Sequence, residues 1–202
     1  MPHISSHRAE AEARLSSKGK SFFRMIEFDD KEQIVMEIRK HPFGLLLIIV
    51  FGIILSFTVA VLPLLVAVFA DNEQLANDPS TSSLEQILMT VSIILGVGGL
   101  IVTTIAALLY VNNVIFVTSE KIAQVLYLGL FNRRISQLSI GDVQDVTVKQ
   151  VGIFPRIFHY GTLVIETAGE QQNYTFTFVP NPYQSSQAIV GAHEENLKLY
   201  GN

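Results

Sequence analysis

Two long runs without a charged residue dominate this sequence, at residues 43–70 and 87–111. A membrane-spanning helix needs about 20 consecutive apolar residues, and both runs are longer than that. A mean hydropathy of +0.39 is also high for a soluble chain, and core helices are rarely so long and so uniformly apolar. We therefore predict two transmembrane helices that form a hairpin, with Pro63 inside the first run as a point where it can bend.

Basic residues are distributed unequally around these two runs. Arg39 and Lys40 precede the first run and Arg133 and Arg134 follow the second, whereas the segment between the runs contains acidic residues but no Lys or Arg. Cytoplasmic segments of membrane proteins are enriched in Lys and Arg. The sequence thus predicts a multi-pass protein of the cytoplasmic membrane, with both termini in the cytoplasm and residues 71–86 as an extracytoplasmic loop.

Both predicted transmembrane helices carry small residues at every fourth position, where they share one helix face. These residues are Gly52, Ser56 and Ala60 in the first helix and Gly99, Thr103 and Ala107 in the second. Small side chains let two helix backbones approach closely in a membrane, so we expect the two rows to face each other, the alternative being chance spacing. Neither run contains Asp, Glu, Lys, Arg or His, which argues against proton or ion transport.

The segment before the first helix divides into two parts. Residues 1–21 are polar and are predicted to be a disordered cytoplasmic tail. Residues 22–42 contain regularly placed apolar residues and are predicted to be a juxtamembrane segment, packed either on the membrane surface or on a soluble domain. Their period does not decide between short strands and a helix. His41 and Pro42 mark the start of the first transmembrane helix, because proline suits a first helical turn.

The pattern changes at residues 113–200 to short strands separated by turns. The clearest strand alternates aromatic Tyr174, Phe176 and Phe178 with threonines, the period of a strand buried on one face. Asn181 and Pro182 then resemble the cap and first residue of a helix. The apolar face predicted for this helix contains Ile189, Val190, His193, Leu197 and Tyr200. The segment is predicted to be a small all-β barrel or sandwich capped by a C-terminal helix.

Four short motifs occur in a defined order along the chain. They are Arg39-Lys40-His41-Pro42, the turn from Val117-Thr118 to Lys121-Ile122, Gly129-Leu130-Phe131, and residues 151–170. Together they resemble the bacterial pleckstrin-homology-like (PH) membrane proteins, a family catalogued as a domain of unknown function, and the resemblance extends over residues 32–195. It implies a PH-like domain on a two-helix membrane anchor. It implies no reaction, because the family has no known shared chemistry.

Catalytic and metal-binding motifs are absent from the sequence. It contains no HExxH, GxSxG or phosphate-binding glycine pattern, and it has no Cys for a thiolate. His159 and His193 are the histidines of residues 113–200, and we expect a loop or packing role for both. We therefore predict no catalytic residue, no metal and no cofactor, and hence a protein that is not an enzyme. A net charge of −4 also argues against nucleic acid as a partner.

The predicted function is non-enzymatic: the protein presents a PH-like domain at the inner leaflet for interaction with a protein partner or for self-association. One alternative is a module that senses anionic lipid, with contacts from Lys121, Arg133, Arg134 and Arg156. Another is an accessory subunit of a membrane enzyme or transporter. The apolar segment at residues 152–158 is either core or an interface with the leaflet or a partner. Its interface candidates are Phe154, Ile157 and Phe158.

Overall fold

The computed structural model describes residues 15–16, 19–20, 26, 32–70, 79–168 and 173–200. The chain forms two compact units. One unit, which we call the β domain, contains residues 1–44 and 109–202, and the other, the helix pair, contains residues 45–108. The loop predicted at residues 71–86 lies in part outside the described residues, and so does most of the predicted tail.

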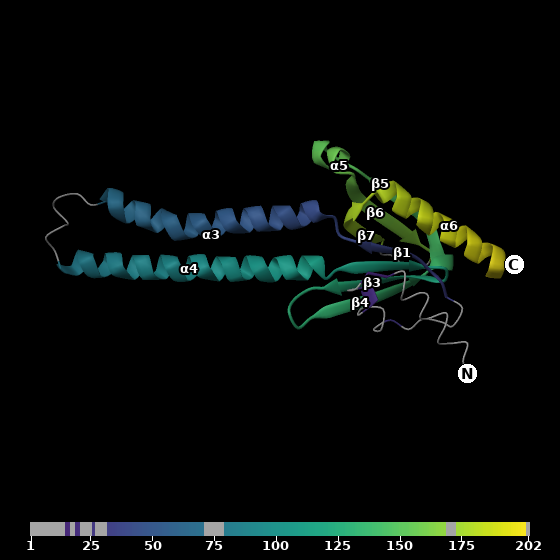
Figure 1. Cartoon of the computed structure of the whole chain (residues 1–202), viewed down its shortest axis with the longest axis horizontal. Helices are drawn as coiled ribbons and strands as arrows, with labels where there is room; N and C mark the ends of the chain where they lie inside the picture. Colours follow the sequence, from purple (N-terminus) through teal and green to yellow (C-terminus); the bar gives the residue numbers. More distant parts are fainter. Residues whose placement is uncertain are drawn as a thin grey trace. The chain divides into compact units, whose positions relative to one another are not determined.

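The helix pair consists of helices α3 (Pro42–Ala70) and α4 (Pro79–Val111), which run side by side in opposite directions (Figure 1). Both are long and apolar enough to cross a membrane, over Pro42–Pro63 and Gln86–Val111. Only 6% and 11% of these segments are buried, so their apolar side chains lie at the surface, unlike those of core helices. Helix α4 begins at Pro79, and its apolar span begins at Gln86, next to the start of the predicted run at residue 87. The turns before this span are polar.

Hydroxyl side chains within the helix pair bond to the backbone of their own helix. Ser56 Oγ donates to Gly52 O at 2.7 Å, and Thr103 Oγ1 donates to Gly99 O at 2.8 Å. Ser92, which is buried, donates in the same way to Leu88 O. These polar groups therefore need no partner from outside their own helix.

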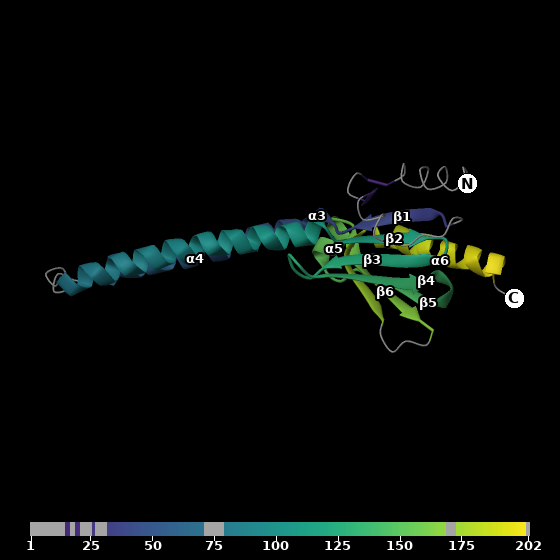
Figure 2. The ribbon, with the colours of Figure 1, turned by 90° about the horizontal axis from the view of Figure 1, so that it is seen from below.

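The β domain contains a four-stranded and a three-stranded antiparallel sheet. The first has the order β1 (Ile34–Arg39), β2 (Val114–Thr118), β3 (Lys121–Tyr127) and β4 (Arg133–Ser139), side by side in Figure 2. The second has the order β5 (Val143–Lys149), β6 (Tyr160–Thr167) and β7 (Tyr174–Pro180). The 3-10 helix η1 (Ile140–Asp142) joins the sheets, α5 (Ile153–Ile157) joins β5 to β6, and α6 (Pro182–Tyr200) ends the domain.

Strand β1 precedes the helix pair in the sequence but pairs with β2, which follows it. Ile38 lies opposite Ile115, and Arg39 lies opposite Val114. The helix pair is thus inserted between two neighbouring strands of one sheet. The domain predicted at residues 113–200 lacks this strand, and the segment predicted as juxtamembrane at residues 22–42 supplies it.

The main core lies between the two sheets and α6. Its most deeply buried side chains include Val117, Ile140, Leu163, Ile165 and Ile189. Helix α6 begins at Pro182, as the sequence predicts, but its buried face differs from the predicted one. Ser185, Ile189 and Ala192 are buried, whereas Val190 and Leu197 are 39% and 47% exposed. Small residues on the contact face let α6 approach the sheets closely, which the larger side chains at 190 and 197 do not allow.

The outer face of the first sheet carries a second apolar cluster. Phe116 and Val125 lie in it, and Leu15 and Ile26 cover them from the N-terminal segment. Ser16 N–H donates to Glu37 Oε2 at 3.0 Å, so the prediction of a disordered tail does not describe Leu15 and Ser16. Burial raises the pKa of Glu37, but the hydrogen bonds from Ser16 and Arg39 outweigh it and hold this pKa below its usual value.

Candidate functional site

Seven aromatic rings of the described residues meet at one end of the β domain, where the chain enters α3 and leaves α4. We call this end the junction end. His41 stacks on Tyr160 with ring centroids 5.3 Å apart, and Phe43 stacks on Tyr160 at 5.2 Å. Phe178 stacks on the Tyr160 ring at 5.3 Å, and its edge meets Tyr110 at 6.1 Å. Phe158 and Phe154 join the group by stacking on Phe43 at 4.7 Å and 5.7 Å.

Hydrogen bonds join the same residues across the junction end. Tyr110 Oη donates to His41 O at 2.7 Å, and His41 N–H donates to Phe178 O at 2.6 Å. Gly44 leaves room for the Tyr110 ring, since a Cβ at this position would lie 2.6 Å from Tyr110 Cζ. The first residues of α3 and the last of α4 are therefore fixed to β7. We did not predict this cluster; aromatic residues at both helix boundaries were the available signal.

The backbone at the junction end adopts a left-handed conformation at three non-glycine residues. They are His159, Phe178 and Asn181, with φ values of 53°, 57° and 43°. For a bulky residue such as Phe178 this conformation is uncommon and unfavourable. It turns the Phe178 ring out of the strand alternation predicted for residues 174–178 and toward Tyr110 and Tyr160.

His41 is held in its neutral form by its surroundings. Burial lowers the pKa of this imidazole below its ordinary value. Its Nδ1 accepts a hydrogen bond from Phe43 N–H at 3.1 Å, which requires an unprotonated Nδ1. Protonation would therefore remove a bond at the start of α3.

The segment at residues 152–158 is exposed rather than part of the core. Phe154, Ile157 and Phe158 are 59%, 60% and 44% exposed, and no residue of α5 is buried. Phe154 also stacks on Phe43, with centroids 5.7 Å apart. Arg156 lies on the same short helix and is exposed. Of the two alternatives drawn from the sequence, the structure excludes the core.

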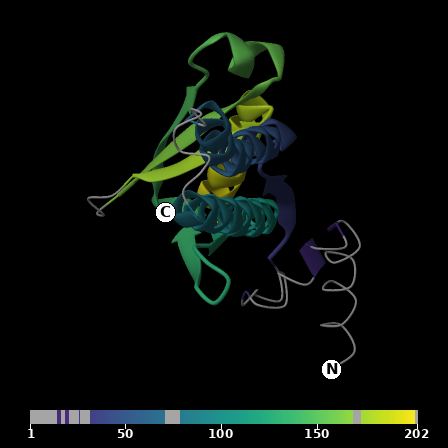
Figure 3. The same cartoon turned by 90° about the vertical axis from the view of Figure 1, so that its left-hand side faces the viewer.

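The turn between β3 and β4 is a second apolar projection at the junction end. Leu128, Leu130 and Phe131 are 58%, 55% and 101% exposed, and Arg133 and Arg134 follow as exposed residues. Backbone bonds between Asn132 and residues 128 and 129 hold the turn, with Leu128 N–H donating to Asn132 O at 2.9 Å. Figure 3 shows this turn and α5 projecting from opposite sides of the domain.

The other end of the β domain, the distal end, contains the β2–β3 turn and η1. Here Lys121 Nζ lies 3.0 Å from Glu32 Oε2, whose side chain is fully buried. Glu32 Oε1 also accepts a hydrogen bond from Thr118 Oγ1 at 2.5 Å. Lys121 is therefore engaged inside the protein, and its prediction as a lipid contact is wrong. The sequence prediction failed because Glu32 lies on the far side of the helix pair in the sequence.

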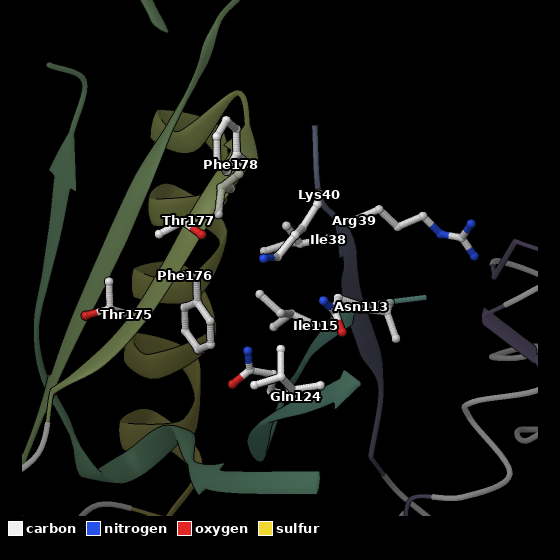
Figure 4. A pocket seen from close by; sticks show the side chains of 13 residues that line it. Ile38, Arg39, Lys40, Asn113, Ile115, Gln124, Thr175, Phe176, Thr177 and Phe178 are labelled. Carbon is white, nitrogen blue, oxygen red and sulfur yellow. The ribbon is translucent and has the colours of Figure 1, made fainter. Parts of the chain in front are cut away.

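A cleft with an empty volume of about 480 Å³, including its open mouth, lies between β1, β2 and β3 on one side and β7 on the other. Ile38, Ile115 and Phe176 form apolar walls, and Lys40 and Gln124 point into the gap (Figure 4). Burial lowers the pKa of the Lys40 amine. Among the described residues Lys40 forms no ion pair, although its Nζ lies 5.2 Å from the Tyr110 ring centroid. The cavity within the cleft has a volume of about 110 Å³, which is smaller than the roughly 300–1,000 Å³ typical of small-molecule pockets.

The small residues predicted to pack the two helices lie opposite one another. A Cβ on Gly52 would collide with the Thr103 side chain, and a Cβ on Gly99 would lie 2.5 Å from Ser56 Oγ. Ala60 instead faces Gly96, whose Cβ would lie 2.8 Å from that of Ala60. Gly96 was not among the predicted residues because it does not follow the spacing of four, and no contact is described for Ala107.

Side chains that could bind a metal ion do not cluster in the described part of the chain. Within the described residues, no group of three His, Cys, Asp or Glu side chains is placed to hold a metal ion. His159 is exposed in the turn before β6. His193 Nδ1–H donates to Ile140 O at 2.7 Å, because a carbonyl can only accept, and so the ring attaches α6 to η1.

Comparison with known proteins gives one match. The model of a family described as Bacterial PH domain matches residues 43–186, a range that begins in α3 and ends in α6. No curated protein and no solved structure matches this chain. The matched range covers more than half of the chain and includes the helix pair and strands β2 to β7.

Proposed function

Because this chain belongs to the bacterial PH domain family, we propose that it is a non-enzymatic membrane protein that presents a PH-like domain for protein interaction or assembly. Helices α3 and α4 form the anchor as a transmembrane hairpin. The domain lies at the inner leaflet of the cytoplasmic membrane. The proposal requires no cofactor.

The apolar surface of the helix pair supports the membrane anchor. Side chains such as Phe51, Leu55, Phe57 and Val102 are each 66% exposed. Exposure of this apolar surface to water is unfavourable in free energy, whereas contact with lipid chains avoids that hydration. The hydroxyl groups within the helices already bond to their own backbone, so they tolerate a lipid environment.

The basic residues beside the helices support the proposed orientation. Arg39 and Lys40 lie before α3, and no Lys or Arg lies in residues 71–86. The positive-inside rule then assigns both termini to the cytoplasm. The chain has no Cys, so single cysteines can report accessibility in intact cells. Ser83→Cys should react with an impermeant maleimide from outside, and Gln144→Cys only after permeabilisation; the reverse result would contradict the orientation.

The cleft is the observation that best supports an interaction function. It combines apolar walls with a Lys40 amine that has no carboxylate partner among the described residues. A partner segment with an acidic residue next to an apolar side chain would match both features. Such a segment can come from another protein or from a second copy of this chain.

Photo-crosslinking from the cleft tests this function in native membranes. A benzophenone amino acid at Gln124, inside the cleft, should crosslink one defined protein, and the same group at exposed Gln144 on β5 should not. Lys40→Gln should weaken the Gln124 adduct, because it removes the charge. Equal adducts from both positions, or none from Gln124, would contradict the proposal. An adduct with this chain itself would identify assembly as the function.

A second candidate function is the sensing of anionic lipid. It is favoured by Arg133, Arg134 and Arg156, which lie beside the two apolar projections of the junction end. Binding of this kind weakens as salt concentration rises. Lipid adducts in place of a protein adduct at Gln124, together with salt-sensitive vesicle binding, would favour this candidate.

A further inference from the structure

The two projections of the junction end expose apolar side chains, and their own sequences contain no acidic residue. Residues 128–134 and 151–158 contain no Asp or Glu, and their charged residues are all arginine. Apolar side chains are also exposed near the end of α6, but there Leu197 and Leu199 alternate with Glu194, Glu195 and Lys198. The projections therefore differ from the end of α6 in both polarity and sign of charge.

Strand register places the β3–β4 turn beside the start of β2. Val125 lies opposite Val114, and Tyr127 N–H donates to Asn113 Oδ1 at 2.7 Å. The turn at residues 128–132 follows directly, so it lies next to the residues that leave α4. The exposed Phe131 ring is thus at the level at which the chain leaves the helix.

Ring stacking places α5 at the same level. Phe154 and Phe158 both stack on Phe43, the second residue of α3. The two projections therefore share one end of the domain although they lie on opposite sides of it (Figure 3). A flat surface that meets this end would contact both of them at once, which a small globular partner would not.

We propose that residues 128–131 and 151–158 insert into the headgroup region of the leaflet next to the domain, with Arg133, Arg134 and Arg156 binding anionic lipid phosphates. This inference rests on the proposed membrane anchor. Apolar and aromatic side chains are favoured at the boundary between headgroups and lipid chains, and adjacent arginines attract anionic lipids. The PH-like domain would then be held at three places, by the chain passage into the helices and by the two projections.

Tryptophan fluorescence can measure the depth of each projection, because the chain contains no Trp. Single variants Phe131→Trp and Phe154→Trp of the full chain would be reconstituted in vesicles of phosphatidylcholine and phosphatidylglycerol. Lipids brominated near the carbonyl or near the chain end would serve as shallow and deep quenchers. Both variants should show blue-shifted emission and stronger quenching by the shallow bromines.

Two further single-Trp variants serve as depth standards. Ile94→Trp lies on the exposed surface of α4 and should be quenched mainly by deep bromines. Leu199→Trp lies near the end of α6, whose Asn196 Nδ2 bonds to Ser119 O at the distal end, and should escape quenching. Quenching at Ile94→Trp without quenching at positions 131 and 154 would overturn the insertion while leaving the anchor intact. Absence of quenching at Ile94→Trp would overturn the anchor and the insertion together.

The role of the arginines has its own control. Arg133→Gln with Arg134→Gln should reduce quenching at Phe131→Trp in vesicles that contain phosphatidylglycerol, and Lys198→Gln in the last turn of α6 should not. Equal quenching with and without the two arginines would overturn the phosphate contacts. Shielding of the tryptophans only after addition of a membrane protein fraction would assign the projections to a protein partner and overturn insertion.

Discussion

The two ends of the β domain differ in how far their side chains find partners within the protein. At the distal end, the buried Glu32 carboxylate pairs with Lys121, and Asn196 and His193 attach α6 to the ends of β2 and η1. At the junction end, rings and aliphatic side chains are exposed, and Phe178 is held in an unfavourable backbone conformation. The polar contacts of the distal end are therefore compatible with exposure of this end to water.

This difference indicates where the domain relies on its surroundings. The Glu32, His193 and Asn196 side chains at the distal end find partners within the chain, although the buried Thr167 Oγ1 forms no hydrogen bond with the described residues. These contacts contribute to folding stability without help from the surroundings. The exposed apolar side chains of the two projections, such as Leu130, Phe131 and Ile157, gain little from the folded domain alone, because most of their surface remains exposed. Stability and function are therefore expected to respond to substitutions at different ends.

The largest expected loss of stability comes from Lys121→Ala at the distal end. It removes the Lys121 ammonium from beside the fully buried Glu32 carboxylate, and removal of one partner costs about 3–5 kcal/mol in comparable buried pairs. Chemical denaturation of the detergent-solubilised protein would measure it. The double variant Glu32→Gln with Lys121→Met should recover most of the loss. A Lys121→Ala protein as stable as the original would show that the distal end does not depend on this pair.

Gly99→Leu is expected to have the next largest effect, in the helix pair. A side chain there meets Ser56 at once, and such overpacking costs about 1–3 kcal/mol. Gly98 is the matched control, since a Cβ on this neighbouring residue meets nothing within 4 Å. Thermal unfolding in detergent should separate Gly99→Leu from Gly98→Leu. Equal melting temperatures would mean that the helices do not pack through this face.

Tyr110→Phe tests the hydrogen bonds of the junction end. It removes the donor to His41 O but keeps the ring against Phe178, so a loss of about 0.5–1.5 kcal/mol is expected. Tyr183→Phe is the control, because Tyr183 is 61% exposed on α6. Denaturation of both variants under one condition would give the comparison, and a larger loss for Tyr183→Phe would contradict the role given to Tyr110.

The smallest effect expected is a dependence of stability on pH through His41. Because its folded-state pKa lies below the unfolded value of 6.5, protonation favours the unfolded chain. This contribution is fully present above pH 6.5 and is lost as the pH falls through the lower, folded-state pKa. Melting temperatures measured between neutral and mildly acidic pH should fall less steeply for His41→Gln than for the original chain. Parallel curves would exclude His41 as the cause.

The features that could be predicted from the sequence are those that depend on composition and on the spacing of apolar residues. The resemblance to bacterial PH proteins is confirmed by the match over residues 43–186, and the strands of both sheets and the start of α6 follow local signals. Strand β1 was not predicted because its register shifts between Ile34 and Met36: Ile34 lies in the cluster on the outer face, whereas Ile38 lies in the core between the sheets. Such a strand shows no alternation.

The candidate site was harder to predict because its parts are distant in the sequence. Phe43, Tyr110, Tyr160 and Phe178 meet only after the chain has passed through two helices and two sheets. The arginines and the apolar segment at residues 152–158 could be selected from local composition. The engagement of Lys121 could not, since its partner Glu32 is brought near by the pairing of β1 with β2.

The insertion of the helix pair between β1 and β2 also constrains the order in which this protein can be made. Strand β1 leaves the ribosome before α3, yet its neighbour β2 appears only after α4 has been synthesised. The first sheet therefore cannot be completed until α4 has been synthesised and β2 lies beside β1. If α3 and α4 span the membrane, completion of the domain would report that both helices have been inserted with the correct topology.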